Sequence, residues 1–305
     1  MKKKVLTTLL LACVLFSGCS KASDETTESV QEENLITEES KEISAGTDST
    51  SDIENEEESE DYSVEMGSGV CYTISNPTWR KFYNGTDSAD NYSHISLTQQ
   101  SEATSDWLDT EVWCEKNGFE YARMPYSDGT YEYETFYTVD DYSATELCIY
   151  DESTETLLYD LDLYLLCYGP DDEDEYSMAI QDIQWAQIDD SANMLYVSII
   201  HNGYASENPR SSHIVAIDLS TMEVVWRSEA QVSGLCNFKI VDDTIICGYG
   251  FTSEPDYIYL LDKHTGDKID QISVASAPEQ MEIRDGILYV ATYNTAYEYI
   301  IEGMQ

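Results

Sequence analysis

The chain has 305 residues and a formal net charge of −45 at pH 7, with 60 acidic side chains against 15 Lys and Arg. Residues 67–305 alone hold 43 acidic and 10 basic side chains. Nucleic-acid binding depends on clustered Lys and Arg, so we exclude nucleic acid as a partner. The same surface repels anionic lipid head groups, so attachment to a membrane requires another part of the chain.

The N-terminal residues follow the order of a secretion signal. Lys2–Lys4 form a positive region, Val5–Phe16 form an apolar run, and two small residues precede Cys19. The apolar run has 12 residues, which is too short for a bilayer-spanning helix of about 20 residues. A second, similar pattern ends at Cys13, but it would leave a much shorter apolar run.

Phe16-Ser17-Gly18-Cys19 resembles the bacterial lipobox, with Phe16 where that family usually has leucine. The resemblance implies that residues 1–18 are a lipoprotein signal peptide and that Cys19 carries a thioether-linked diacylglycerol. Acyl chains hold a protein at a membrane at about 0.8 kcal/mol per buried CH₂. We therefore expect an extracytoplasmic protein anchored to the cell membrane by the lipid on Cys19. A plain secretory peptide or an uncleaved anchor is the alternative.

Residues 19–66 are dominated by Ser, Thr, Glu and Asp and have almost no large apolar side chains. Such a segment buries too little surface to offset the entropy of ordering, so we predict a disordered acidic tether. A flexible coil of this length spans roughly 40 Å, and repulsion between its carboxylates extends it further. The tether would hold the following domain away from the membrane.

Residues 67–305 consist of short runs rich in Tyr, Val, Ile and Thr, broken about every 8–12 residues by turn-forming residues. This texture predicts an all-β domain. Helical periodicity is confined to a turn or two around Asp106–Lys116.

A strand, an Asp-x-x-Thr-(Gly) turn and a second strand recur along this domain. The Asp would cap the turn by accepting backbone N–H groups, and glycine would adopt the positive φ that a bulged type I turn requires. An aromatic residue eight positions after the Asp would wedge between neighbouring units. The residues in these positions are Asp151, Asp218, Thr221, Trp226, Asp262, Thr265 and Gly266. A second series of turns precedes them at Asp128-Gly129, Asn193, Asp242-Asp243 and Asp285-Gly286.

The repeats from Ala216 to Trp226 and from Leu261 to Gly266 resemble those of quinoprotein-like (PQQ-like) β-propellers, clearly over about residues 183–305 and faintly over 70–165. The spacing of the turns also fits a propeller blade of about 40–50 residues. Met222 and Glu155 replace the repeat glycine and Asp270 replaces the tryptophan, which indicates a degenerate propeller rather than a quinone enzyme.

The resemblance implies a β-propeller of five to six four-stranded blades over residues 67–305. A pair of β-sandwiches is the structural alternative. The expected blades lie near 76–115, 119–163, 183–230 and 235–274, with three more strands in 279–305 that Val70–Ser75 would complete.

The residues favour no catalytic site, no metal site and no cofactor. The four histidines occur singly, Gly67-Ser68-Gly69 lacks the context of a nucleophile elbow, and Asp171–Glu175 lacks the glycine of a calcium loop. Six cysteines follow the tether, and free buried thiols are favoured for them over disulfides. Cys236 with Cys247 is the best candidate for a bridge.

Tyrosine is unusually abundant, with 24 residues. Its flat ring and polar tip suit protein interfaces and sugar rings, although it also packs well within sheets. The candidate binding surface consists of Tyr121, Tyr126, Tyr131, Tyr133 and Tyr137.

We therefore expect a non-catalytic binding or scaffolding module that recognises a protein partner through one loop face. The alternatives are a cell-surface glycan-binding protein or sensor, and a polysaccharide lyase or hydrolase. A cluster of carboxyl groups with perturbed pKa values in a central cleft would favour the enzyme, and an exposed aromatic patch would favour binding.

The lipobox resemblance generates the first prediction. Replacement Cys19→Ser should abolish metabolic labelling with a palmitate analogue and release the protein from the membrane fraction, because the acylated thiol is lost. The matched control Cys13→Ser should keep both properties. Loss of labelling in Cys13→Ser with retention in Cys19→Ser would move the lipid to the other site.

Overall fold

The computed structural model describes residues 70–75, 81–137, 143–168 and 181–304. The signal peptide, Cys19 and the tether lie outside the described residues, as does the acidic run Asp171–Glu175. The chain divides into two units, Met1–Asp61 and Tyr62–Gln305, and all described residues belong to the second. Within the described ranges, no helix is both long and apolar enough to cross a bilayer.

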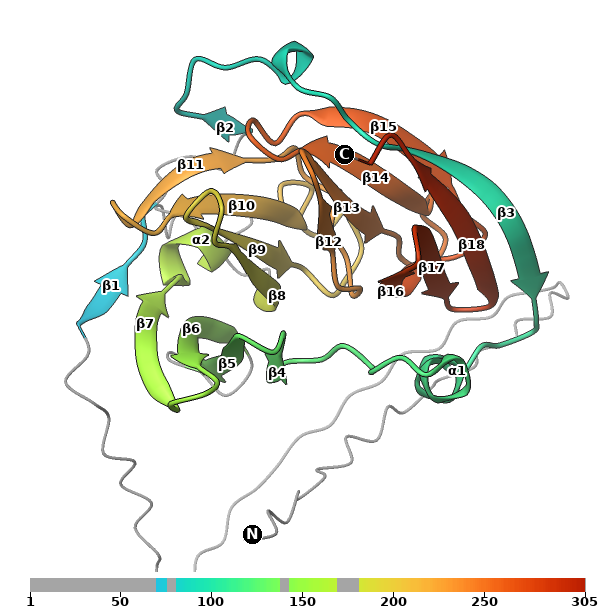
Figure 1. The fold of residues 1–305 in the computed structure, drawn as a ribbon, viewed down its shortest axis with the longest axis horizontal. Helices are drawn as coiled ribbons and strands as arrows, with labels where there is room; N and C mark the ends of the chain where they lie inside the picture. The colour runs from blue at the N-terminus through green and yellow to red at the C-terminus, as the bar shows by residue number, and fades with distance from the viewer. Residues whose placement is uncertain (1–69, 76–80, 138–142, 169–180, 305) are drawn as a thin grey trace, which may run out of the picture. The chain divides into compact units, whose positions relative to one another are not determined.

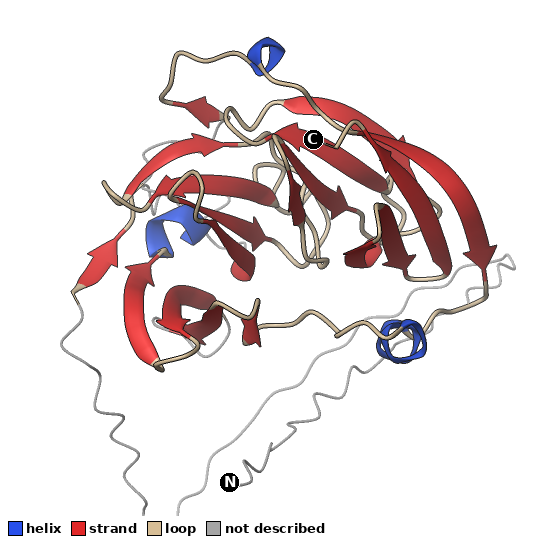
Figure 2. Cartoon of the chain, in the orientation of Figure 1, coloured by secondary structure: helices blue, strands red, loops and turns tan. Residues whose placement is uncertain are grey.

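The described part is mostly β-structure, as its composition predicts, and its strands form four sheets of four or five strands (Figures 1 and 2). Helix α1 (Thr110–Asn117) confirms the short helix expected around Asp106–Lys116. The 3₁₀ helix η1 (Ala89–Asn91) and the five-residue α2 (Tyr164–Tyr168) were not expected. Each sheet contains three or four strands that are consecutive in the chain and antiparallel.

The first sheet has the order β1-β7-β6-β5-β4, and β1 pairs with β7 in parallel. Its strands are β1 (Cys71–Thr73), β4 (Tyr126–Ser127), β5 (Tyr131–Tyr137), β6 (Ala144–Asp151) and β7 (Thr156–Asp162). The second sheet has the order β2-β11-β10-β9-β8. Its strands are β2 (Phe82–Tyr83), β8 (Asp182–Asp189), β9 (Met194–Ile200), β10 (His213–Asp218) and β11 (Glu223–Arg227).

The third sheet has the order β12-β13-β14-β15, and the fourth has the order β16-β17-β18-β3. The third comprises β12 (Lys239–Val241), β13 (Thr244–Tyr249), β14 (Tyr257–Asp262) and β15 (Lys268–Ser273). The fourth comprises β16 (Pro278–Arg284), β17 (Ile287–Thr292), β18 (Thr295–Glu302) and β3 (Ser96–Thr104). The units predicted at 119–163, 183–230, 235–274 and 279–305 each correspond to one of these sheets.

The unit predicted near 76–115 was wrong, because the described residues there form no sheet of their own. Its strand β2 joins the outer edge of the second sheet, and β3 completes the fourth. Val70–Ser75 therefore does not close the C-terminal strands as predicted, and β1 pairs in the first sheet instead. The physical reason is length: β3 offers eight register pairs to β18, whereas β1 offers three to β7, so β3 satisfies more backbone groups at the open edge.

The three Asp-x-x-Thr turns adopt the predicted geometry. The Asp151 carboxylate accepts from the Thr154 amide at 2.8 Å, and Asp262 accepts from the Thr265 amide at 2.7 Å. The residue in the glycine position has φ of 55° in Glu155, 58° in Met222 and 70° in Gly266. In Asp218 the carboxylate accepts from the Ser220 amide at 2.7 Å. All three turns thus have a positive φ at this position, although only one of them has glycine there.

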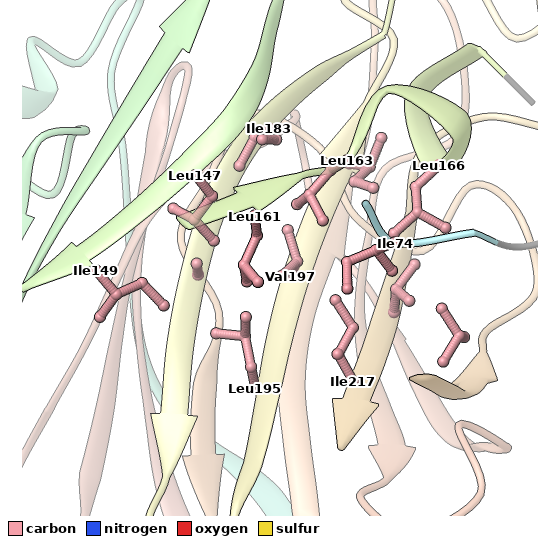
Figure 3. Close-up of a cluster of buried hydrophobic side chains, with 14 of the residues drawn as sticks. Ile74, Leu147, Ile149, Leu161, Leu163, Leu166, Ile183, Leu195, Val197 and Ile217 are labelled. Atoms are coloured by element: carbon pink, nitrogen blue, oxygen red, sulfur yellow. The ribbon is translucent and has the colours of Figure 1, made fainter. Parts of the chain in front are cut away.

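Three apolar clusters occupy the interfaces between successive sheets. Figure 3 shows the cluster between the first and second sheets, where Leu147 and Leu161 lie near Leu195 and Val197. A second cluster includes Trp226, which donates from Nε1 to the Lys263 carbonyl at 3.0 Å and so joins the second sheet to the third. This is the wedge position that the repeat predicts for its aromatic residue. The third cluster joins the third and fourth sheets.

All six cysteines of the described part are free thiols, and five of them are buried. Cys247 on β13 and Cys236, shortly before β12, are both buried and form no disulfide with each other. Burial raises the pKa of Cys236 to about 12, so this thiol stays protonated at neutral pH.

The turn geometry generates a prediction for stability. Gly266→Ala should lower the free energy of unfolding by about 2–4 kcal/mol, because its Cβ would lie 2.5 Å from the Trp226 ring at a positive φ. Glu155→Gly, at the equivalent and exposed position, should raise it by up to about 1 kcal/mol through relief of the left-handed conformation. Urea denaturation measures both. Changes of the same sign in the two free energies of unfolding would contradict the prediction that both positions share a left-handed geometry.

Candidate functional site

A cavity of about 250 Å³ lies where one edge strand from each of the four sheets meets the others. Each of these strands, β4, β8, β12 and β16, is an edge strand of its sheet, so one side of each strand is open to a shared space. The sheets are thus arranged around this cavity, as the inner ends of blades would be. The strand residues that line it are Tyr126, Ser127, Trp185, Gln187, Lys239 and Glu282.

Residues 119–125, here called the central segment, form the remaining wall of the cavity together with Asp128. They also line a second hollow of about 500 Å³ with Ile183, Gln184, Leu235 and Glu279. Ile183, Gln184 and Glu279 lie nearer the start of their strands than the residues that line the first cavity. Leu235 precedes β12. The central segment therefore separates two hollows at different levels along the same edge strands.

Gln280 fixes the central segment to the fourth sheet. This side chain is fully buried, and its Oε1 accepts from the Ala122 amide at 3.0 Å while its Nε2 donates to the Glu120 carbonyl at 3.3 Å. Arg284 adds a hydrogen bond from its guanidinium to the Asn117 carbonyl at 2.9 Å, just before the segment. These two side chains thereby pair backbone groups of residues 117–122 that form no strand hydrogen bonds.

Two of the charged groups at the cavity, Lys239 and Glu282, are paired with each other. Lys239 Nζ lies 2.9 Å from Glu282 Oε2, and Gln280 Nε2 donates to the other oxygen of Glu282 at 2.7 Å. Arg123 stacks over the Tyr121 ring, with 4.4 Å between the guanidinium carbon and the ring centroid. The cavity offers aromatic faces and both signs of charge, a combination that suits recognition.

The structure packs three tyrosines of the predicted binding surface together, because the Tyr133 ring contacts those of Tyr126 and Tyr131, and it separates the other two from them. Tyr133 is fully buried, and its hydroxyl accepts from the Ile188 amide at 3.0 Å. Tyr126 stacks on Trp185 at 3.7 Å between ring centroids, and the Tyr131 hydroxyl donates to Asp190 at 2.6 Å. These three rings join the first sheet to the second. Of the other two, Tyr121 lines the cavities and Tyr137 is 62% exposed on β5.

Among the described residues, two carboxyl groups have clearly raised pKa values, and neither lines the central cavity. Burial and then the Glu254 charge raise the pKa of Asp256 to about 6. Burial and then the Asp160 charge raise the pKa of Glu146. Neither group therefore occupies the central cleft, where perturbed carboxyl groups would favour an enzyme.

The structure also has an exposed apolar patch that the sequence did not predict, which we call the Trp107 patch and define as Trp107, Val112 and Tyr293. Trp107 is 60% exposed and Tyr293 51% exposed. The Leu108 amide donates to the Tyr293 carbonyl at 2.9 Å, which brings the two segments side by side, and Val112 follows on the first turn of α1. The isolated aromatic at position 107 was the available signal, but its neighbour comes from a distant part of the chain.

No family model and no curated protein matches this chain. Among solved structures, BamB from Moraxella catarrhalis is 13% identical with a TM-score of 0.31, over 51% of this chain and 53% of that chain. Kuenenia stuttgartiensis hydrazine synthase is 11% identical with a TM-score of 0.33, over 54% of this chain and 41% of that chain. The match thus spans about half the length of these structures, and the likeness is too weak to carry an argument about function.

The role of Gln280 generates a prediction. Gln280→Met keeps the volume but leaves the backbone groups of the central segment unpaired, so the free energy of unfolding should fall by about 1–3 kcal/mol. The control Gln99→Met, at an exposed position on β3, should change it by less than about 0.5 kcal/mol. Urea denaturation monitored by Trp fluorescence measures both. An unchanged midpoint in Gln280→Met would show that the segment is held by other contacts.

Proposed function

We propose that this protein is a lipid-anchored, extracytoplasmic binding or scaffolding module with a propeller-like domain, and that it holds a protein partner without catalysing a reaction. The observation that supports a protein partner best is the Trp107 patch. Single exposed apolar residues are ordinary, but a tryptophan beside a tyrosine is typical of the residues that dominate binding energy at protein interfaces.

The position of the patch supports a fixed recognition surface. Its residues lie on the segment after β3 and on the turn between β17 and β18, and strand pairing over eight register pairs holds these together. Asp109 caps α1 by accepting from the Val112 amide at 3.0 Å, which orders the adjoining turn. A preorganised surface binds with a smaller entropic cost.

The charge around the patch indicates the chemistry of the partner. Asp106 and Glu111 are exposed beside it, and the domain as a whole is strongly acidic. Opposite charge across an interface raises the rate of encounter and excludes wrong partners. The partner is therefore expected to present apolar side chains within a basic surface.

A cell-surface glycan is the second candidate, and a hollow on the third sheet favours it. The hollow has a volume of about 310 Å³ and is lined by Tyr249, Tyr257, Tyr259 and Glu254. The Asp256 carboxyl, with its raised pKa, lies in the same loop. Aromatic faces beside a protonatable carboxyl also suit a polysaccharide-cleaving enzyme, which is the catalytic alternative to a binding protein.

Site-specific photocrosslinking in the source cells tests the proposal. The full-length protein carries p-benzoylphenylalanine at position 107, at 293, or at the control position 204, where Tyr204 is 42% exposed in the loop between β9 and β10. We expect one basic protein to crosslink from 107 and 293 but not from 204. The purified pair should then lose at least tenfold in affinity with Trp107→Ala/Tyr293→Ala and keep its affinity with Tyr204→Ala.

Two outcomes would contradict the proposal. Crosslinks that are equal from all three positions, or binding that survives the double substitution, would remove the Trp107 patch from the interface. A glycan array run on the same protein distinguishes the second candidate. Glycan capture that is lost in Tyr257→Ala, without a position-specific crosslink, would favour the carbohydrate reading.

A further inference from the structure

Two cysteines and two carboxylates lie together on one face of the first sheet. Cys71 on β1 pairs in register with Asp160 on β7, and Asp160 pairs with Cys148 on β6. Glu146 precedes Cys148 by two residues, so the alternation of a strand places both side chains on the same face. The row therefore crosses three strands, from the sheet edge at β1 inward.

The side chains of three of these residues converge. One ligand atom each of Glu146, Cys148 and Asp160 lies within 4.8 Å of the others. Cys148 Sγ is 4.0 Å from Glu146 Oε1 and 4.0 Å from Asp160 Oδ1. Asp160 is 9% exposed and Cys148 5% exposed, whereas Cys71 is open to solvent at the edge.

The cluster concentrates negative charge that the described residues do not neutralise. The charges acting on Glu146, Cys148 and Cys71 come from acidic groups. Within the described ranges, the hydrogen-bond partners of the buried Asp160 are these two thiols and the Glu146 carboxyl, and none of them is a cation.

A buried carboxylate normally has a cationic partner or coordinates a metal, because removing it from water is otherwise costly. A disulfide would not relieve the crowding. Cys71 and Cys148 are separated by β7, which places their Cα atoms about 9–10 Å apart, and a disulfide needs less than about 7 Å. Both thiols thus remain available as ligands.

We propose that Glu146, Cys148 and Asp160 bind one divalent transition-metal ion of borderline softness, Zn²⁺ being the type, with Cys71 as the fourth ligand. Zn–S and Zn–O bonds of about 2.3 and 2.1 Å at tetrahedral angles separate sulfur and oxygen by about 3.6 Å, so the observed 4.0 Å separations need to close only slightly. A mixed thiolate and carboxylate set excludes Mg²⁺ and Ca²⁺, which prefer oxygen alone. The ion would tie β1 to β6 and β7.

Co²⁺ replaces Zn²⁺ as a spectroscopic probe in the test, with the full-length protein reduced and stripped of metal. We expect saturation at one Co²⁺ per chain, with a near-ultraviolet sulfur-to-metal charge-transfer band and the visible bands of tetrahedral Co²⁺. Cys148→Ser should abolish the charge-transfer band or reduce it strongly, and Cys71→Ser should reduce it by about half. The control Cys114→Ser, a buried thiol in α1, should leave the spectrum unchanged.

Conservative carboxylate variants keep the test decisive should a cysteine variant fail to fold. Glu146→Gln should weaken binding of Zn²⁺ at least tenfold by calorimetry, whereas Glu132→Gln, on the same sheet face but outside the cluster, should not. Zn²⁺ should also raise the melting temperature of the native protein but not of Glu146→Gln. Absence of saturable binding, or an unchanged Co²⁺ spectrum in a folded Cys148→Ser, would overturn the proposal.

Discussion

The pairing of β3 with β18 is the constraint on which the rest of the described fold depends. Thr104 and Thr295, which face each other at one end of this ladder, are 191 residues apart in the chain. The entropy of closing so long a loop grows only with the logarithm of its length, and eight register pairs offset it. Once β3 completes the last sheet, the chain must return across the inner strands to begin the first.

That return path creates the candidate functional features. The segment from Ser105 to Pro125 carries Trp107 at its start, α1 in its middle and the central segment at its end. Gln280 and Arg284 hold it against the fourth sheet, so it separates the two hollows instead of filling either. The surface that we propose for a partner and the wall of the central cavity are thus consequences of one topological requirement.

The first sheet behaves differently from the other three. One face packs against the second sheet through Leu147 and Tyr133, while the opposite face gathers Glu146, Cys148 and Asp160. A purely apolar exposed face would promote aggregation. The carboxylates on this face prevent that, but their mutual repulsion costs electrostatic energy. A bound cation would remove that cost and fasten the short edge strand β1, the first element after the predicted tether.

The sequence by itself determined the local structure: the all-β texture, the turns at Asp151, Asp218 and Asp262, and the bounds of four repeating units, because hydrophobic alternation and turn chemistry act over a few residues. It also suggested Trp226 as a wedge. Only the tertiary structure decided that β3 rather than β1 closes the fourth sheet and that Cys71 and Cys148 flank Asp160. It also decided that Tyr133 is buried while the segment of Trp107 lies beside the turn of Tyr293. These facts depend on strand register and on contacts between residues distant in sequence, and composition and spacing do not encode the competition between edges that settles them.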